Sequence, residues 1–262
     1  MKKLISIDLF ADFGMLKKPD TNEPVYLTFN ILHKPVLLGI LGAIIGLEGF
    51  KEKGKLPEYY EKLKDLKVGI QPLNHENGNF QKTTLTYNNT TGMASKEQGG
   101  NLMITEQTLI APAFRCYFLL DTDNELHQKI DNNLSTYNAE FLPYLGKNEF
   151  SIWWEEYKSY GFNSYNTLGS FRISSIFIKD KPLKDNRDMD TLLNYDPVID
   201  DILTGCTFSY FERLPVGYID IGKSNYQYNY CNFAYTDWGM KLKNKSYNTL
   251  LKIHNEEIIQ VF

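Results

Sequence analysis

The stretch Pro-Tyr-Leu-Gly-Lys-Asn-Glu-Phe occupies residues 143–150 of the chain. A glycine turn that carries a basic residue and an amide follows a predicted helix here and leads into a predicted strand. Because Gly146 has no side chain, the backbone of this turn can approach a phosphate or a base closely. The turn closes a βαββαβ pattern that begins at residue 3, and this combination predicts the fold.

The elements next to the turn follow from local spacing. Residues 106–121 predict a strand, since their apolar residues alternate. Thr122 and Glu125 match a capping box, which predicts a helix that continues to about residue 137. Residues 150–157 predict the next strand.

The N-terminal part supplies the first half of the pattern. Residues 3–10 alternate apolar and polar side chains, which predicts a half-buried strand. Pro35 stands where a first helical residue would stand, and the apolar run after it predicts a helix over 35 to about 50. Residues 66–73 predict the second strand.

A polar stretch rich in glycine and threonine separates the second and third strands. Residues 84–87 and 102–105 are predicted to pair, so that the segment 76–105 forms a long protruding hairpin. The order is then that of the ferredoxin-like, or RNA-recognition-module, α+β arrangement. We expect a domain over 1–160 with this hairpin inserted, and a smaller β-rich C-terminal part over 161–262.

Composition limits the classes of function. The 262 residues carry a net charge of −4, with 42% hydrophobic and 23% charged residues. A protein that coats nucleic acid without selectivity would be basic, so any nucleic-acid contact is expected in a local groove. The apolar run 36–47 is too short to span a bilayer, and no membrane association is expected.

Cysteine usage argues against a metal or redox site. The three cysteines lie far apart and no CxxC pair exists, so neither a metal nor a cofactor is expected. An odd number of cysteines without a secretory signal suits a reducing compartment, and we expect a cytoplasmic protein.

Several stretches together resemble a known family. They are LISIDLFADFG at 4–14, LTFNILHKPVLLGILGAIIGLEGF at 27–50, and TEQTLIAPAFRCYFLLD at 105–121 followed by PYLGKNEF. In their order and spacing the chain resembles the Cas-five subunit of type I CRISPR surveillance complexes (Cascade), most like the type I-B branch, within the RAMP superfamily. The resemblance covers most of 3–157 and is weaker beyond it, where ERLPVGY at 212–218 carries it.

The resemblance implies a role in antiviral defence. Members of this family cap one end of the complex, hold the 5′ handle of the CRISPR RNA, and contact the backbone subunit and the large subunit. Target DNA would be met only through the complex, and the protruding hairpin would be the family's thumb. The chain departs from the family at Pro35, where a threonine often follows the basic residue.

Holding RNA requires cations for phosphates, aromatic faces for unpaired bases, and amides for base edges. Lys34 and Lys147 rank first because each borders a family motif, and His33 supplies a polar edge beside Lys34. The other lysine candidates are Lys17, Lys18, Lys82 and Lys96. Solvated surface is the alternative for each of them.

Further candidates come from the turns and strands. Phe13 and Tyr87 could stack on bases, and Arg115 could line the groove or pack against the C-terminal part. Residues whose backbone or amide could touch RNA are Gly146, Asn148, Gly99, Gly100 and Asn101. The alternating tyrosines of 226–230 fit either a partner-protein surface or packing between sheets.

Catalysis is not expected. The type I-C branch of the family cleaves precursor RNA without a metal, which requires a general base. Only His33, beside Lys34, lies on a motif expected to face RNA, and the sequence defines no histidine–lysine–tyrosine cluster. A metal-independent endoribonuclease with His33 as base remains the alternative, and a protein-binding module without RNA is a third.

Overall fold

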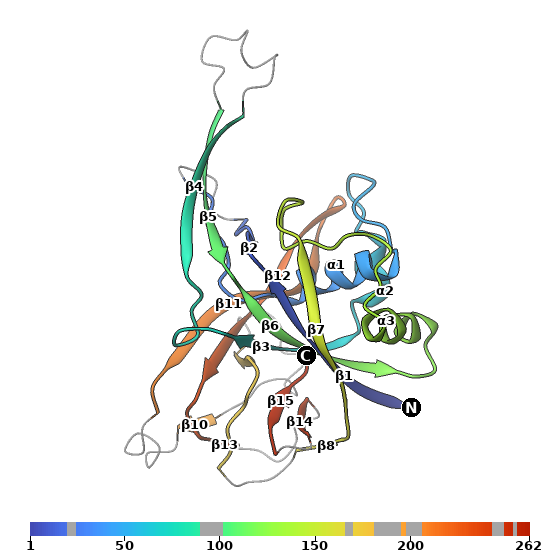
Figure 1. Cartoon of the computed structure of the whole chain (residues 1–262), viewed down its shortest axis with the longest axis vertical. Helices are drawn as coiled ribbons and strands as arrows, with labels where there is room; N and C mark the ends of the chain where they lie inside the picture. Colours follow the sequence, from blue (N-terminus) through green and yellow to red (C-terminus); the bar gives the residue numbers. More distant parts are fainter. Residues whose placement is uncertain are drawn as a thin grey trace.

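The structure is a computed structural model in which the described residues are 1–19, 25–89, 102–165, 170–180, 195–197, 206–242, 249–253 and 256–262. At its centre lies a four-stranded antiparallel sheet with the order β3-β6-β1-β7 (Figure 1). These strands are β1 (Lys2–Ala11), β3 (Lys67–Leu73), β6 (Ala113–Asp121) and β7 (Ile152–Tyr160). The molecule is an α+β protein built largely from antiparallel sheets.

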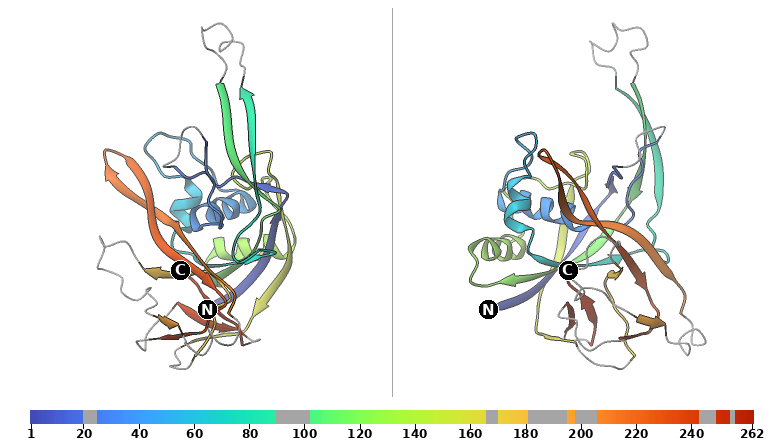
Figure 2. Two further views of the ribbon diagram at one scale, coloured as in Figure 1. Left: turned by 90° about the vertical axis from the view of Figure 1, so that its left-hand side faces the viewer. Right: turned by 180° about the vertical axis from the view of Figure 1, so that it is seen from behind.

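The helices connect alternate strands of this sheet. The chain passes from β1 through α1 (Lys34–Ile45) and α2 (Glu58–Leu63) to β3, with β6 between the two strands. It then passes from β6 through α3 (Glu125–Ser135) to β7, with β1 between them. The helices lie on one face of the sheet (Figure 2).

The first strand is buried on both faces, so the prediction of a half-buried strand was wrong. Ile5 and Leu9 pack with the helices, as alternation predicts. On the other face Ser6 and Asp8 are also buried. Ser6 hydrogen-bonds the hydroxyl of Tyr160 at 2.9 Å, which compensates for its removal from water.

The first helix ends earlier than predicted. Gly46 follows Ile45 with φ of 77°, a left-handed conformation that glycine adopts without strain and that stops a helix. The amide of Leu47 donates to the carbonyl of Gly42 at 2.8 Å and closes the last turn. The predicted strand 106–121 is likewise two strands, because Ala111 has a φ of 46° and Pro112 follows it.

The predicted hairpin is confirmed in its described part. β4 (Lys82–Asn89) pairs with β5 (Leu102–Ile110), with Tyr87 opposite Ile104. The short strand β2 (Phe13–Gly14) extends this sheet on the β5 side. The hairpin projects from the body of the molecule (Figure 1).

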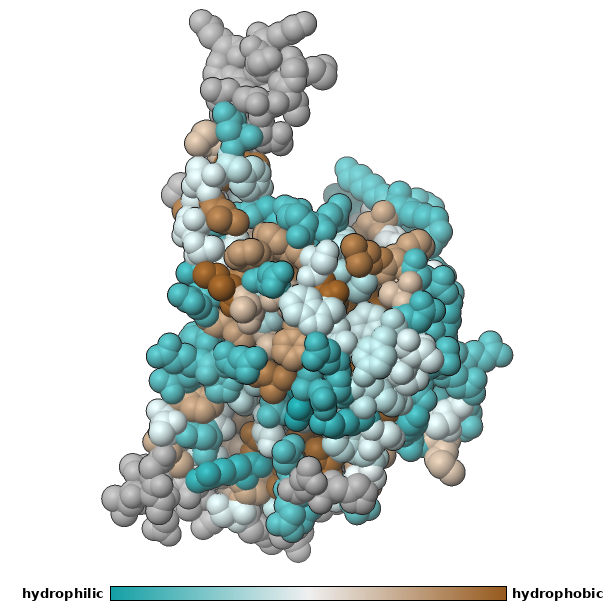
Figure 3. Space-filling view, viewed as in Figure 1, coloured by the Kyte–Doolittle hydropathy of each residue, from teal (hydrophilic) through white to brown (hydrophobic). Residues whose placement is uncertain are grey.

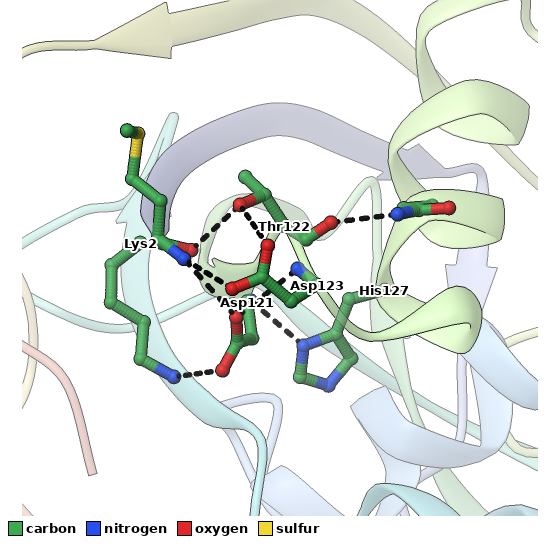
Figure 4. Close-up of polar contacts among 7 residues, drawn as sticks. Lys2, Asp121, Thr122, Asp123 and His127 are labelled. Carbon is green, nitrogen blue, oxygen red and sulfur yellow. Dashed lines mark hydrogen bonds and ion pairs between the residues drawn. The ribbon is translucent and has the colours of Figure 1, made fainter.

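The cap of α3 differs from the predicted capping box. Asn124 is the N-cap, and its side chain accepts from the amides of Leu126 and His127. Thr122 instead donates to the carbonyl of Met1 at 3.0 Å (Figure 4). The box does not form because Thr122 instead bonds Met1 at the end of the paired central strands β1 and β6.

The C-terminal part covers both faces of the central sheet. β11 (Ser209–Gly222) and β12 (Asn225–Thr236) form a long hairpin beside β9 (Phe177–Asp180), and α1 lies between this hairpin and the sheet (Figure 2). On the opposite face β8 (Phe162–Ser164), β14 (Leu250–Ile253) and β15 (Ile258–Gln260) form a second small sheet. The remaining pair is β10 (Tyr195–Pro197) with β13 (Met240–Leu242).

One hydrophobic core joins the two parts of the chain. Leu214 and Phe233 of the long C-terminal hairpin belong to the same buried cluster as Ile7, Leu37 and Phe118. No helix among the described residues is long and apolar enough to span a membrane. The described residues also contain no group of three metal-binding side chains.

Candidate nucleic-acid interface

A pocket of about 370 Å³ lies at the foot of the β4–β5 hairpin. Segments far apart in the sequence meet there: residues 15–17, the start of α1, the hairpin, the turn at 146–147, and β12. Five of the residues predicted from sequence line it, and they are Lys17, His33, Tyr87, Gly146 and Lys147. We call it the hairpin pocket.

Gly146 is required by close packing within the chain. Its φ is 87°, and a Cβ at this position would clash with the carbonyl oxygen of Met15. The amide of Met15 donates to the carbonyl of Leu145 at 3.1 Å, which joins the two segments. The close approach predicted here is therefore made by the chain itself, and it places Lys147 at the pocket wall.

Lys147 is held at the wall by two residues of the hairpin. Its ammonium group binds the carboxylate of Glu106 and donates to the hydroxyl of Tyr87 at 3.2 Å. Partial burial lowers the pKa of Lys147, but the hydrogen bonds to Glu106 and Tyr87 together with the charge of Glu106 outweigh it, and the net pKa is raised. Lys147 therefore carries its charge at neutral pH.

Lys17 supplies a second cation on an exposed segment. Its Nζ lies 3.7 Å from the centroid of the Tyr26 ring. The amide of Tyr26 donates to the carbonyl of Thr105 at 2.9 Å, which fixes the segment along the hairpin. The ammonium group thus lies over the face of the ring, and this cation–π contact holds Lys17 at the pocket.

His33 faces the pocket but is almost fully buried. Its ring packs edge-on against Phe29 at 5.1 Å and against Tyr228 at 5.6 Å between centroids. Burial lowers its pKa to about 3, so the imidazole is neutral at neutral pH. Its Nδ1 is buried without a hydrogen-bond partner among the described residues.

Lys34 points away from the pocket and toward the C-terminus. It is buried, and its Nζ donates to the backbone carbonyl of Phe262 at 3.1 Å. Burial lowers its pKa to about 8. Lys34, which ranked first among the RNA-binding candidates together with Lys147, thus makes a hydrogen bond inside the fold.

Lys18 and Lys82 also have partners within the chain. Lys18 lies 3.5 Å from the carboxylate of Glu212. Lys82 donates to the side-chain oxygen of Asn30 at 2.7 Å, and burial lowers its pKa. The two lysines tie neighbouring segments to the loop that precedes α1.

Arg115 lies on the face of the sheet opposite the helices. Its guanidinium pairs with both carboxylate oxygens of Asp8 at 2.6 and 2.7 Å, and this hydrogen bonding raises its pKa. Phe13 is exposed on β2, with its ring 5.9 Å from that of Phe150. Asn148 is exposed on the turn after Lys147. The other candidates, Lys96, Gly99, Gly100 and Asn101, lie outside the described residues.

Sequence reasoning missed six residues of the pocket, three of which are acidic or aromatic. Glu106 is a buried acid at the hairpin base, and the contrast with the threonine-rich strand around it is a usable signal. Tyr26 lies in a predicted loop, where single aromatics carry little information. Tyr228 comes from the C-terminal hairpin, and no local pattern brings it to the start of α1.

The sequence matches no protein-family model, and it matches no curated protein. Solved structures with a similar backbone course include one described as a CRISPR protein from Archaeoglobus fulgidus, with 12% identity, coverage of 100% of this chain and 98% of that chain, and a TM-score of 0.47. A chain of a CRISPR RNA-guided surveillance complex has 10% identity, coverage of 93% and 92%, and a TM-score of 0.49. A chain of a type III-B Cmr-beta complex bound to cognate target RNA and AMPPnP has 11% identity, coverage of 91% and 86%, and a TM-score of 0.45. These structural neighbours of the chain are CRISPR-associated proteins.

Proposed function

We propose that this protein is a non-catalytic RNA-binding subunit of a CRISPR surveillance complex, of the Cas-five kind and type I-B branch, with a ferredoxin-like central domain. In this role its hairpin pocket holds the 5′ handle of the CRISPR RNA. The observation that carries the proposal is that Lys17, Tyr87 and Lys147, chosen from three separate segments, line one pocket.

The chemistry of the pocket suits a single-stranded RNA. Lys17 and Lys147 offer cations to phosphates, and the partly exposed ring of Tyr87 lies in the same pocket. His33 is neutral and its unpaired Nδ1 is buried, so it lines the pocket without adding charge. Since the whole chain is acidic, this local arrangement is where RNA affinity would arise.

The surroundings of the pocket suit assembly with other subunits. The β4–β5 hairpin projects away from the body, where it could lie between neighbouring subunits (Figure 1). Apolar residues gather around the foot of this hairpin in the space-filling view (Figure 3). Exposed apolar surface of this kind is typical of protein interfaces, in keeping with contacts to a backbone subunit and a large subunit.

The environment of His33 supports the non-catalytic reading. A general base is most effective when its pKa lies near the working pH. The pKa of His33 is about 3, far below that range, because the ring is buried between aromatic neighbours. The alternative, an endoribonuclease with His33 as base, therefore lacks a suitable proton acceptor at that position.

One experiment separates the two functions. The full-length protein is incubated with labelled repeat RNA in a chelator, and the sample is divided between a binding assay and a denaturing gel. We expect the RNA to be bound and intact. A single defined cut that disappears in His33→Ala would establish the endoribonuclease and reject the scaffold proposal.

A further inference from the structure

A second pocket, of about 640 Å³, lies beneath the β11–β12 hairpin next to the hairpin pocket. Lys18 and Phe29 form one wall, and Arg213, Tyr226, Gln227 and Tyr228 contribute to the other. Tyr228 also lines the hairpin pocket, so the two pockets share a wall residue. We call this second site the tyrosine pocket.

The tyrosine pocket combines aromatic faces with cations. The rings of Tyr218 and Tyr228 stack with centroids 5.0 Å apart and an interplanar angle of 26°. The guanidinium of Arg213 lies 4.5 Å from the centroid of Tyr230. Tyr226 is 38% exposed, so it presents part of its ring to solvent. Stacked rings beside cations are the means by which proteins bind unpaired nucleotides.

The acid in this pocket already has partners. The carboxylate oxygens of Glu212 accept from the backbone amides of Asn30 and Ile31, each at 3.0 Å. Lys18 lies 3.5 Å from the same carboxylate. The negative charge is therefore compensated within the fold, and Arg213 remains to give the pocket a cationic side chain at its exposed edge.

We infer that RNA leaving the hairpin pocket crosses Tyr228 and places an unpaired base in the tyrosine pocket. The base stacks on the tyrosines of β12, and Arg213 contacts the adjoining phosphate. Gln227, which is exposed beside Tyr226, offers an amide to the base edge. This inference rests on the proposed function, because it extends the path of the same strand.

The features of the pocket favour RNA over a peptide. Aromatic grooves also bind proline-rich segments, which are recognised through ring stacking without phosphate contacts. Here a cation lies against the ring of Tyr230, and the pocket adjoins a site that is itself lined by Lys17 and Lys147. Charge and continuity therefore both point to a phosphate-bearing strand.

The test uses the full-length protein and oligouridine in which thiouridine replaces one uridine at a time. We expect ultraviolet cross-links from separate positions of the RNA to reach the hairpin pocket and Tyr226. The variant Arg213→Gln with Tyr226→Ala should bind the RNA roughly tenfold more weakly. The matched control is Lys179→Gln, which removes a cation 5.0 Å from the ring of Phe211 on the same hairpin, outside the pocket, and should bind normally.

The contrary outcomes are distinguishable. Full affinity of the double variant, with cross-links confined to the hairpin pocket, would overturn this inference and leave the proposed function standing. Failure of the wild-type protein to bind RNA would overturn both. Binding of a proline-rich peptide that Tyr226→Ala abolishes, with no cross-link to this pocket, would identify it as a peptide site and reject the inference.

Discussion

The start of α1 and the turn at residues 146–148 share a sequence feature, a lysine beside a stretch that resembles the Cas-five family, yet the fold uses the two lysines differently. Lys34 is buried and donates to the last carbonyl of the described chain, that of Phe262. Lys147 stays at the wall of a pocket, where it pairs with Glu106. Proximity to such a stretch therefore does not decide which lysine stays at a pocket. The outcome depends on which segment of the chain packs over the lysine.

The two regions also differ in their electrostatics. Burial lowers the pKa of His33 to about 3 and that of Lys34 to about 8, and at Lys34 the loss of water outweighs the opposing charge of Asp65. The pKa of Lys147 is raised, because its contacts with Glu106 and Tyr87 together outweigh burial. The regions should consequently respond to pH with opposite signs.

The largest effect is expected at His33 in acid. Its folded pKa of about 3 lies below the ordinary value of 6.5, so the unfolded chain takes up the proton first as the pH falls. The free energy of unfolding should drop by about 2 kcal/mol by pH 5 and by roughly 4–5 kcal/mol by pH 3. Urea denaturation of wild type and His33→Leu at several pH values measures this. His33→Leu should lack this part of the decrease in the free energy of unfolding at acid pH. If the free energies of unfolding of the two proteins fall in parallel with pH, His33 is not a buried neutral imidazole.

A smaller effect of alkaline pH is expected at Lys34. Its folded pKa of about 8 lies below the ordinary 10.5, so the folded chain loses the proton first as the pH rises. The contribution of Lys34 to stability should therefore increase by roughly 3 kcal/mol between pH 8 and 10.5. Lys34→Met serves as the reference in denaturation curves, because other groups that titrate in this range are common to both proteins. If the difference in the free energy of unfolding between wild type and Lys34→Met stays constant from pH 8 to 10.5, the pKa of Lys34 is not lowered by burial.

The contribution of Lys147 to stability should change with pH in the opposite direction, and by a smaller amount. Because its folded pKa is raised, its contribution is complete below pH 10.5 and is lost as the pH rises through the folded pKa. At neutral pH, Lys147→Met should cost about 1–2 kcal/mol, since it leaves the carboxylate of Glu106 buried without a cation. Adding Glu106→Gln should restore most of the loss in a double-mutant cycle. Additive losses would mean that the two side chains do not act as a pair.

Local patterns predicted the strands and helices well where one face packs on the core. The apolar run of α1 is an example, and the two strands of the β4–β5 hairpin were also predicted, whereas the alternation of β1 predicted a strand but not the burial of its second face. Contacts between segments that are distant in the sequence could not be predicted from local patterns. Asp8 and Arg115 form an ion pair only because β1 and β6 are in register, and Tyr228 reaches His33 only because the C-terminal hairpin folds over α1. Such contacts bury Lys34, and they bring the unpredicted residues Tyr26 and Tyr228 to the pocket.

The most direct test of the central claim measures the affinity of Lys17→Gln and Lys34→Met for single-stranded RNA across a range of salt concentrations, with Lys129→Gln on α3 as a surface control. If the hairpin pocket holds the RNA, Lys17→Gln should bind several-fold more weakly and lower the slope of log affinity against log salt by about 0.7. Lys34→Met and Lys129→Gln should bind like the wild type. A loss of affinity in Lys34→Met with none in Lys17→Gln would contradict the account and place the RNA at the start of α1.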